Sequence, residues 1–337
     1  MAIIDRDGAT VAAAQTLTEV EWTRSLDAVS TGRAVIRPDG DCCARIGQVR
    51  SWRHRLVIYR DSRYVWDGPI TEIDWSQESV EIHARDVLAW LDNRVPHSSM
   101  RFEDSDLMQI GAWLIADGYA PDDPGHVVEV LGKAGVRGAR EYFKNVGQTG
   151  DHLRELAEAG IDFTAIGQKI LLLPETYLHS VGRLSDVDLP DGLVVSENGS
   201  GLVTRWIVAG DEESGALGIA GGRHDYYGLH ERYVEAPEIP DSASALESAR
   251  ARLRASSEVP VFVDTQEVTV SPDAAIDVPS LVPGHALDVT SASTCRQVSQ
   301  RLKIVGLKVT ESGGDDDSPG QESVQVQVAA SGAEAMF

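Results

Sequence analysis

Apolar and polar side chains alternate in two neighbouring segments of this 337-residue chain. In residues 71–75, TEIDW, two acidic side chains alternate with apolar ones, and residues 80–84, VEIHA, repeat this period of two. Such a period is typical of a strand with one buried face, and the four polar residues between the segments suit a hairpin loop. We therefore predict a β-hairpin here, followed by a short helix with Asp86 at its N-cap.

Apolar side chains at helical spacing occur in three other segments. They predict amphipathic helices in residues 105–119, 149–160 and 242–257, and Gly160 is a typical residue to end the second helix. Strand-like runs fill most of the chain on both sides of residues 99–180. The sequence therefore predicts an α+β fold that is mostly β, with an α+β segment inserted between two strand-rich parts.

The glycine- and serine-containing segments do not match catalytic motifs. Residues 215–222, GALGIAGG, lack the GxGxxG spacing and lead into no helix, so we predict a surface loop there. Residues 192–210 are predicted to form a hairpin that turns at Asn198 and Gly199. The histidines are scattered and the three cysteines lack the spacing of a metal site. The sequence therefore predicts no catalytic residues, no cofactor and no metal, and a protein that is not an enzyme.

The C-terminal region contains a strand-like segment behind a linker. Residues 311–320, ESGGDDDSPG, have the composition of a linker, and Val324, Val326 and Val328 then alternate with polar residues. A strand of this kind must pair, either with the chain's own sheet or with a neighbouring molecule. The three valines are therefore candidate interface residues.

The charge balance is strongly acidic, with 30 Lys and Arg against 53 Asp and Glu and a formal net charge of −23. This excess argues against binding nucleic acid, which requires a basic surface. Six arginines nevertheless crowd between residues 45 and 63. They suit either strand edges that resist aggregation or an interface with an acidic neighbour. These interface candidates are Arg45, Arg50, Arg53, Arg55, Arg60 and Arg63.

Several segments, in a fixed order, resemble one protein family. They are WTRSLDAVSTGRAVI, SWRHRLVIYRDSRYVWDGPITEIDW and ARDVLAWLDNR in the first hundred residues, and GDHLRELAEAGIDFT, YYGLHERYVE and VPSLVPGHALDV farther along. In these segments the chain resembles the minor tail proteins of long-tailed actinobacterial phages, the ReqiPepy6 Gp37-like group. That group is similar to the baseplate-hub proteins of contractile tails.

The resemblance implies a structural hub at the phage tail tip, assembled as a homotrimer in the virion after synthesis in the host cytoplasm. Two β-barrel domains per protomer would build a ring that gives DNA a channel for ejection. The implied partners are the distal tail ring, the tape measure protein, and tip or fibre proteins; DNA would pass without specific binding, and the host envelope would be reached indirectly. The implied domains are a first barrel (1–98), an inserted α+β domain (99–180), a second barrel with helix 242–257 (181–311), and a linker with a partner-binding strand (312–337).

An acidic channel would repel DNA during ejection, since charge repulsion extends over about 8–10 Å at physiological salt. The channel-lining candidates are Glu72, Asp74, Asp264 and Glu267. A second class of function stays open. The acidic residues between Asp104 and Asp123 allow a cell-wall hydrolase or a carbohydrate-binding tail component.

Overall fold

The computed structural model describes residues 1–13, 17–37, 46–192, 195–197, 199–210, 212–237, 239–256, 261–263, 267–271, 274–292, 297–313 and 320–330. The chain divides into two compact units: unit 1 comprises Met1–Gly192 and Gln266–Ser331, and unit 2 consists chiefly of Leu193–Thr265. Strands dominate and helices are fewer, so the predicted α+β class with a β majority is confirmed. The described residues include no helix that is long and apolar enough to span a membrane.

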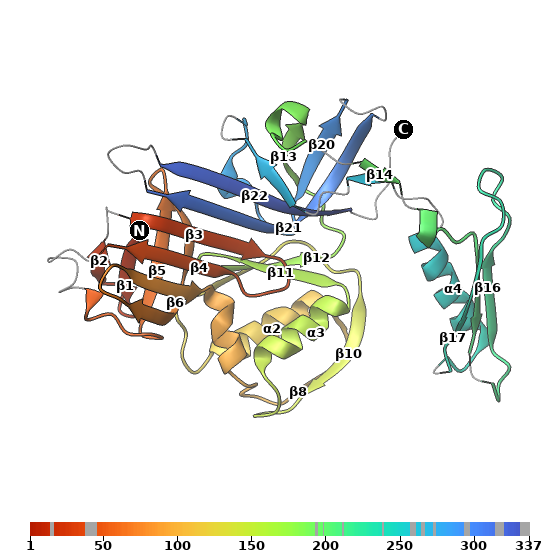
Figure 1. The fold of residues 1–337 in the computed structure, drawn as a ribbon. Coiled ribbons are helices and arrows are strands. Elements are labelled where there is room, and N and C mark those ends of the chain that lie inside the picture. The colour runs from red at the N-terminus through yellow and green to blue at the C-terminus, as the bar shows by residue number, and fades with distance from the viewer. Residues whose placement is uncertain are drawn as a thin grey trace. The chain divides into compact units, whose positions relative to one another are not determined.

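Unit 1 is built on one large sheet of twelve strands (Figure 1). The strands are β1 (Ala2–Asp5), β2 (Thr10–Ala13), β3 (Leu17–Ser25), β4 (Thr31–Ile36), β5 (His54–Arg60), β6 (Arg63–Trp75), β7 (Val80–Arg85), β13 (Ser180–Ser185), β19 (Glu267–Val270), β20 (Ala286–Ser291), β21 (Val298–Ser312) and β22 (Gln321–Ala330). The main path runs β13-β20-β21-β3-β4-β7-β6-β5-β1-β2, and β22 joins β21 and carries β19. Among the described residues this path is open, so a single chain does not form the two closed barrels implied by the family resemblance.

The predicted hairpin is confirmed as β6 and β7. The first half of β6 pairs with β5 and its second half with β7, and the register shifts between Ile70 and Glu72. One strand therefore carries the sheet around a corner. The ring of the buried Trp66 of β6 lies close to the backbone of β4, because a Cβ added to Gly32 would be only 2.8 Å from this ring. Glycine at this position lets the indole lie against the backbone of β4.

Asp86 caps the helix after the hairpin, as predicted, although this helix, η1 (Val87–Asn93), is a 3-10 helix. One carboxylate oxygen accepts the amide of Leu88 at 3.0 Å, and the other accepts the amide of Ser30 at 2.7 Å. Burial raises the pKa of Asp86 to about 7. The cap thus joins η1 to the connection between β3 and β4.

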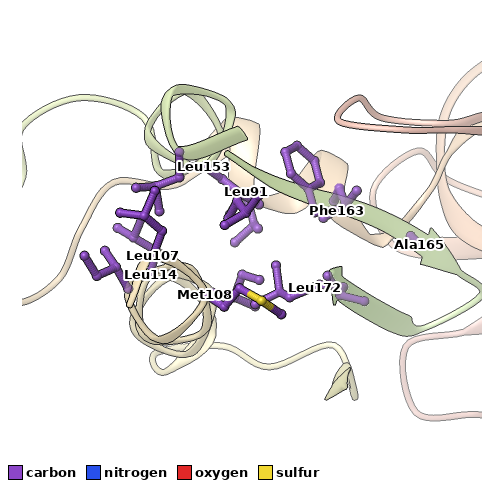
Figure 2. Close-up of a cluster of buried hydrophobic side chains, with 14 of the residues drawn as sticks. Leu91, Leu107, Met108, Leu114, Leu153, Phe163, Ala165 and Leu172 are labelled. Atoms are coloured by element: carbon purple, nitrogen blue, oxygen red, sulfur yellow. The ribbon is translucent and has the colours of Figure 1, made fainter. Parts of the chain in front are cut away.

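Residues 99–180 contain both helices and strands. The elements are β8 (Met100–Asp106), α2 (Leu107–Tyr119), β9 (Val127–Val130), β10 (Arg137–Tyr142), α3 (Thr149–Glu158), β11 (Ile161–Ile166) and β12 (Lys169–Pro174). Figure 1 shows α2 and α3 side by side next to β11 and β12, which form a sheet with β9. The apolar faces of α2 and α3 meet Leu91 of η1, Phe163 of β11 and Leu172 of β12 in one buried cluster (Figure 2). Gly160 follows α3 with a φ of +120°, which explains why glycine ends this helix.

This α+β segment is joined to the large sheet through β11. The amide and side chain of Asp27 both bond the backbone of Phe163, each at 2.8 Å. Thr164 donates to the carbonyl of Ser25 at 2.9 Å, and Lys303 of β21 forms a buried ion pair with Asp162. The segment is therefore held by polar contacts as well as by its apolar core.

Unit 2 contains the predicted helix as α4 (Ser242–Ser256). It packs on a three-stranded sheet of β16 (Leu217–Gly221), β15 (Arg205–Ala209) and β17 (Glu231–Glu235). The predicted hairpin over residues 192–210 is wrong, because β14 (Val195–Glu197) pairs with the distant β18 (Val261–Val263). The predicted loop over 215–222 is also wrong, since it contains β16. Its small residues serve helix packing: a Cβ on Gly218 would lie 2.1 Å from the backbone of Ala245 in α4.

The remaining 3-10 helices are η2 (Asp186–Asp188), η3 (Gly199–Gly201) and η4 (Val278–Ser280). The four-part division into residues 1–98, 99–180, 181–311 and 312–337 stays a prediction. In the structure the inserted segment belongs to the same compact unit as the large sheet.

Candidate functional site

One face of the large sheet carries a continuous set of charged side chains. Its register places Thr310, Glu21, Arg33, His83 and Glu72 in one row across five adjacent strands. Residues directly opposite each other in a sheet share a face, so these side chains point to the same side. We call this surface the charged face; its members are Glu19 and Glu21 of β3, Arg33 of β4, Glu72 and Asp74 of β6, Glu81 and His83 of β7, and Lys308 of β21.

Local alternation explains why these residues lie on the outside. In residues 19–25 of β3, and along β4 and β7, every second residue is buried, including Trp22, Ala34 and Ile82. The intervening positions are therefore left for charged side chains. The face continues onto β22, whose Gln325 and Ser323 lie opposite Lys308 and Thr310 of β21.

Arg33 is the centre of an ion-pair chain on the charged face. Its guanidinium pairs with Glu19 on one side and with Glu81 on the other. The hydrogen bond from Arg33 holds the pKa of Glu81 below its usual range. The imidazole of His83 lies 3.1 Å from Glu81 and 3.8 Å from Asp74, while Lys308 pairs with Glu21 at 3.1 Å. Acidic groups outnumber basic ones, so the face has a net negative charge.

The channel candidates divide into three cases. Glu72 and Asp74 both lie on the charged face and are exposed, with 65% of the Asp74 side chain accessible. Glu267 lies in β19, opposite Gln327 of β22. Asp264 lies outside the described residues. The structure thus brings Glu72 and Asp74 together with Glu81, which sequence reasoning did not select although it shares the same alternation.

The arginine-rich segment is used within the chain. The guanidinium of Arg60 donates two hydrogen bonds to Glu322 of β22, at 2.6 and 2.8 Å. Arg50 donates to the carbonyls of its own turn, and Arg45 lies outside the described residues. The other pairs join Arg53 to Asp5 at 2.9 Å, Arg55 to Asp67 at 2.8 Å and Arg63 to Asp277 at 2.5 Å. Most of the acidic partners expected from a neighbour are therefore found in the same molecule.

The C-terminal valines face the interior. β22 pairs with β21 on one side and β19 on the other, and Val324, Val326 and Val328 are all buried. Of the two alternatives that the sequence left open, the structure shows pairing with the chain's own sheet. These valines do not form an exposed surface for a partner.

The acidic residues between Asp104 and Asp123 have structural contacts. Asp104 pairs with Arg137, and Asp106 caps α2 by accepting the amide of Met108. Asp122 pairs with Arg6, and Asp123 accepts from His126. Within the described parts of the chain, no group of three or more His, Cys, Asp and Glu side chains is arranged to hold a metal.

The carboxyl groups with the highest pKa values bind backbone amides. The pKa of Asp27 rises to about 7, chiefly through burial, and its carboxylate accepts the amide of Phe163. Asp86 has a comparable pKa and caps η1. Shifted pKa values often mark active sites, but these two groups serve the packing of β11 and η1.

No protein-family model matches the chain, and no curated protein sequence matches it. Solved structures do match it over almost its whole length. A 43 kDa tail protein of prophage MuSo2 from Shewanella oneidensis is 14% identical, with a TM-score of 0.62, and the match covers 97% of each chain. The prophage tail protein gp18 from Listeria monocytogenes is 9% identical, with a TM-score of 0.59, over 96% of this chain and 93% of that one.

The E. coli protein c3393 is described as a component of the type VI secretion system with structural similarity to the T4 tail proteins gp27 and gp5. It is 11% identical, with a TM-score of 0.54, over 95% of this chain and 75% of that one. Identities this low establish a shared fold, and the narrower resemblance to the ReqiPepy6 Gp37-like group stays a prediction. The chain has the fold of prophage tail proteins.

Proposed function

We propose that this protein is a structural hub of a phage tail tip. The observation that carries the proposal is the likeness to prophage tail proteins, which extends over nearly all of both chains. A fold alone does not determine function, and the described residues include no group of three or more His, Cys, Asp and Glu side chains that could hold a metal. In this role three copies form a ring that connects the tail tube and the distal tail ring to the tip.

The charged face supports a channel-lining role within this ring. It is wide, spans β21, β3, β4, β7 and β6, and has a net negative charge on a chain whose formal charge is −23. Phosphate groups of DNA are repelled by such a surface over about 8 Å at physiological salt. We propose that Glu72 and Asp74 face the channel and that the distal tail ring, the tape measure protein and tip proteins are the neighbours of the hub.

The assembly is tested by electron microscopy of the full-length protein produced together with its neighbouring tail proteins. The expected particle is a three-fold ring with an open bore. A monomer in the finished tail, or a ring of another symmetry, would contradict the proposal.

The channel is tested by reversing charge on the face. The double variant Glu72→Lys with Asp74→Lys is expected to assemble normally and to slow DNA ejection, because phosphates bind to lysines along their path. The matched control is Glu103→Lys with Asp104→Lys, which changes the charge equally on the exposed strand β8 of the α+β segment. If the Glu72→Lys, Asp74→Lys variant ejected DNA at the wild-type rate, Glu72 and Asp74 would not line the channel.

A further inference from the structure

The strand β9 has an unpaired edge. It lies at the end of the sheet β11-β12-β9, and no other strand in the described residues pairs with its outer side. The amides of Val127 and Leu131 donate toward β12, to Gln168 at 2.9 Å and to Leu172 at 2.8 Å. Successive residues of a strand alternate in direction. The amides of Val128 and Val130 therefore point outward, ready to pair with another strand.

A pocket opens beside this edge. Its volume is about 320 Å³, at the low end of the range typical of ligand pockets. One wall is formed by three rings, Tyr177, His179 and His285, and the floor by the apolar side chains of Leu131, Leu171 and Val282. We call it the ring pocket. Leu131 follows β9 directly, so the free edge and the pocket are neighbours.

The wall of the ring pocket is preformed. Val282, Pro283, Gly284 and His285 form a turn closed by a 3.0 Å hydrogen bond from the amide of His285 to the carbonyl of Val282. Proline followed by glycine with a φ of +86° is the signature of a type II turn. Tyr177 is held by a similar bond to Pro174 at 2.8 Å, and its ring lies 5.2 Å from that of His285. The backbone at both Tyr177 and His285 is thus held by a short turn.

The chemistry of the pocket favours an apolar side chain. Burial, and then the neighbouring His179, lower the pKa of His285, so this imidazole is neutral at pH 7. At the rim, Glu129 of β9 and Lys169 of β12 neutralise each other at 2.8 Å. The neutral His285 and the apolar floor suit an aliphatic or aromatic side chain better than a charged group.

We propose that an extended segment of a partner polypeptide adds to β9 as a fourth strand and places one apolar side chain in the ring pocket. Strand addition of this kind takes its affinity from main-chain hydrogen bonds and its specificity from pockets for alternate side chains. On one face of β9, Val128 packs toward the core around α2; on the other, Glu129 and Leu131 line the pocket. Alternate side chains of the added strand would therefore lie over the pocket. The inference does not depend on the hub function.

Two observations favour a different molecule over a second copy of this chain. The sequence analysis left open that β22 pairs with a neighbouring molecule. In the structure β22 is already paired with β21 and β19, so the β22 of a second copy is not free to add to β9. The chain's formal charge of −23 also favours a basic partner segment by charge complementarity. The favoured occupant is a segment with apolar residues at alternate positions and basic residues between them.

The proposal is tested with a library of random ten-residue peptides selected on the purified full-length protein. Selected peptides are expected to alternate apolar and basic residues. A selected peptide is then measured against Val130→Pro, which removes an outward amide that the fold itself does not use, and against Val130→Thr, which keeps it. Proline is tolerated at such positions on edge strands. Binding is expected to fall at least about tenfold for Val130→Pro and to be retained by Val130→Thr.

Two further measurements keep the test independent of any loss of folding. With peptide bound to the wild-type protein, the amides of Val128 and Val130 should become protected from hydrogen exchange. Tyr177→Ala should weaken binding by about tenfold, because it opens the wall of the pocket. Selection of no alternating peptide, equal binding to Val130→Pro, or unchanged exchange at both amides would overturn the proposal. A change in self-association of Val130→Pro, measured by sedimentation, would identify a second copy as the occupant and overturn the assignment to a different partner.

Discussion

Arg24 is expected to be a main determinant of the stability of unit 1. Only 1% of this residue is exposed, and its guanidinium donates to the carbonyls of Pro279 at 2.8 Å, Leu281 at 3.1 Å and Val65 at 2.8 Å. It also lies over the ring of Trp22 at 5.0 Å. Burial lowers its pKa to about 10, so the side chain stays charged at pH 7. One cation thus joins β3, β6 and the segment around η4.

The magnitude follows from these contacts. Hydrogen bonds to a charged group contribute about 1.5–3 kcal/mol each, so three give about 4.5–9 kcal/mol before the cost of burial. Removing the guanidinium from water costs several kcal/mol and offsets part of this gain. The variant Arg24→Met keeps an unbranched apolar stem but leaves three carbonyl oxygens without this donor. We expect it to lower the free energy of unfolding by about 3 kcal/mol.

Urea unfolding followed by tryptophan fluorescence measures this loss, since Trp206 lies in unit 2 and the other six tryptophans lie in unit 1. The control is Arg33→Met on the charged face, a half-exposed arginine whose ion pairs are worth at most about 1 kcal/mol. Arg24→Lys keeps the charge without the planar fork and should fall between wild type and Arg24→Met. If the free energy of unfolding of Arg24→Met lies within about 0.5 kcal/mol of the wild-type value, the three carbonyls find other donors and Arg24 is not a main determinant of stability.

Two other variants test the packing of unit 1. Because burial raises the pKa of Asp27 to about 7, the native carboxyl binds its proton more tightly than the unfolded one, and this residue lowers stability as pH rises from about 4 to 7. The side chain of Asp27→Asn can still accept the amide of Phe163. This variant should therefore be more stable than wild type at pH 8, by up to about 4 kcal/mol, and similar to wild type at pH 4. Urea unfolding that gives the same difference in free energy between variant and wild type at both pH values would contradict this. Gly68→Ala should prevent folding, since its Cβ would lie 1.8 Å from the carbonyl oxygen of Arg85. The control is Gly222→Ala, whose Cβ would meet no atom within 4 Å and which should fold normally. Soluble yield and circular dichroism measure folding of both variants.

The arginine-rich segment shows how an unusual local composition is used in this fold. The pairs of Arg60 with Glu322 and of Arg63 with Asp277 connect the β5–β6 hairpin to residues more than two hundred positions away. The clustering of arginines could be read from the sequence, but the acidic residues with which they pair could not. An interface and an internal ion-pair set require the same residue type, and only the position of the acids distinguishes them.

Elements whose signals are local could be predicted from the amino-acid sequence. Alternation predicted the β6–β7 hairpin and placed Glu72 and Asp74 on its exposed side, and Asp86 and Gly160 marked helix ends where the structure has them. Each of these signals lies within a few residues of the element that it specifies. Side-chain period and capping depend on the local backbone and need no distant partner.

Which segments meet could not be predicted from such local signals. Tertiary contacts pair β14 with β18 instead of its neighbour, make β16 from a glycine-rich segment that α4 covers, and bury Arg24 on a strand whose Glu19, Glu21 and Thr23 lie on the outside. These outcomes depend on groups that are far apart in the chain. The spacing of apolar residues in a segment predicts that one of its faces is buried. The segment that covers this face depends on shape and hydrogen bonding across the whole fold.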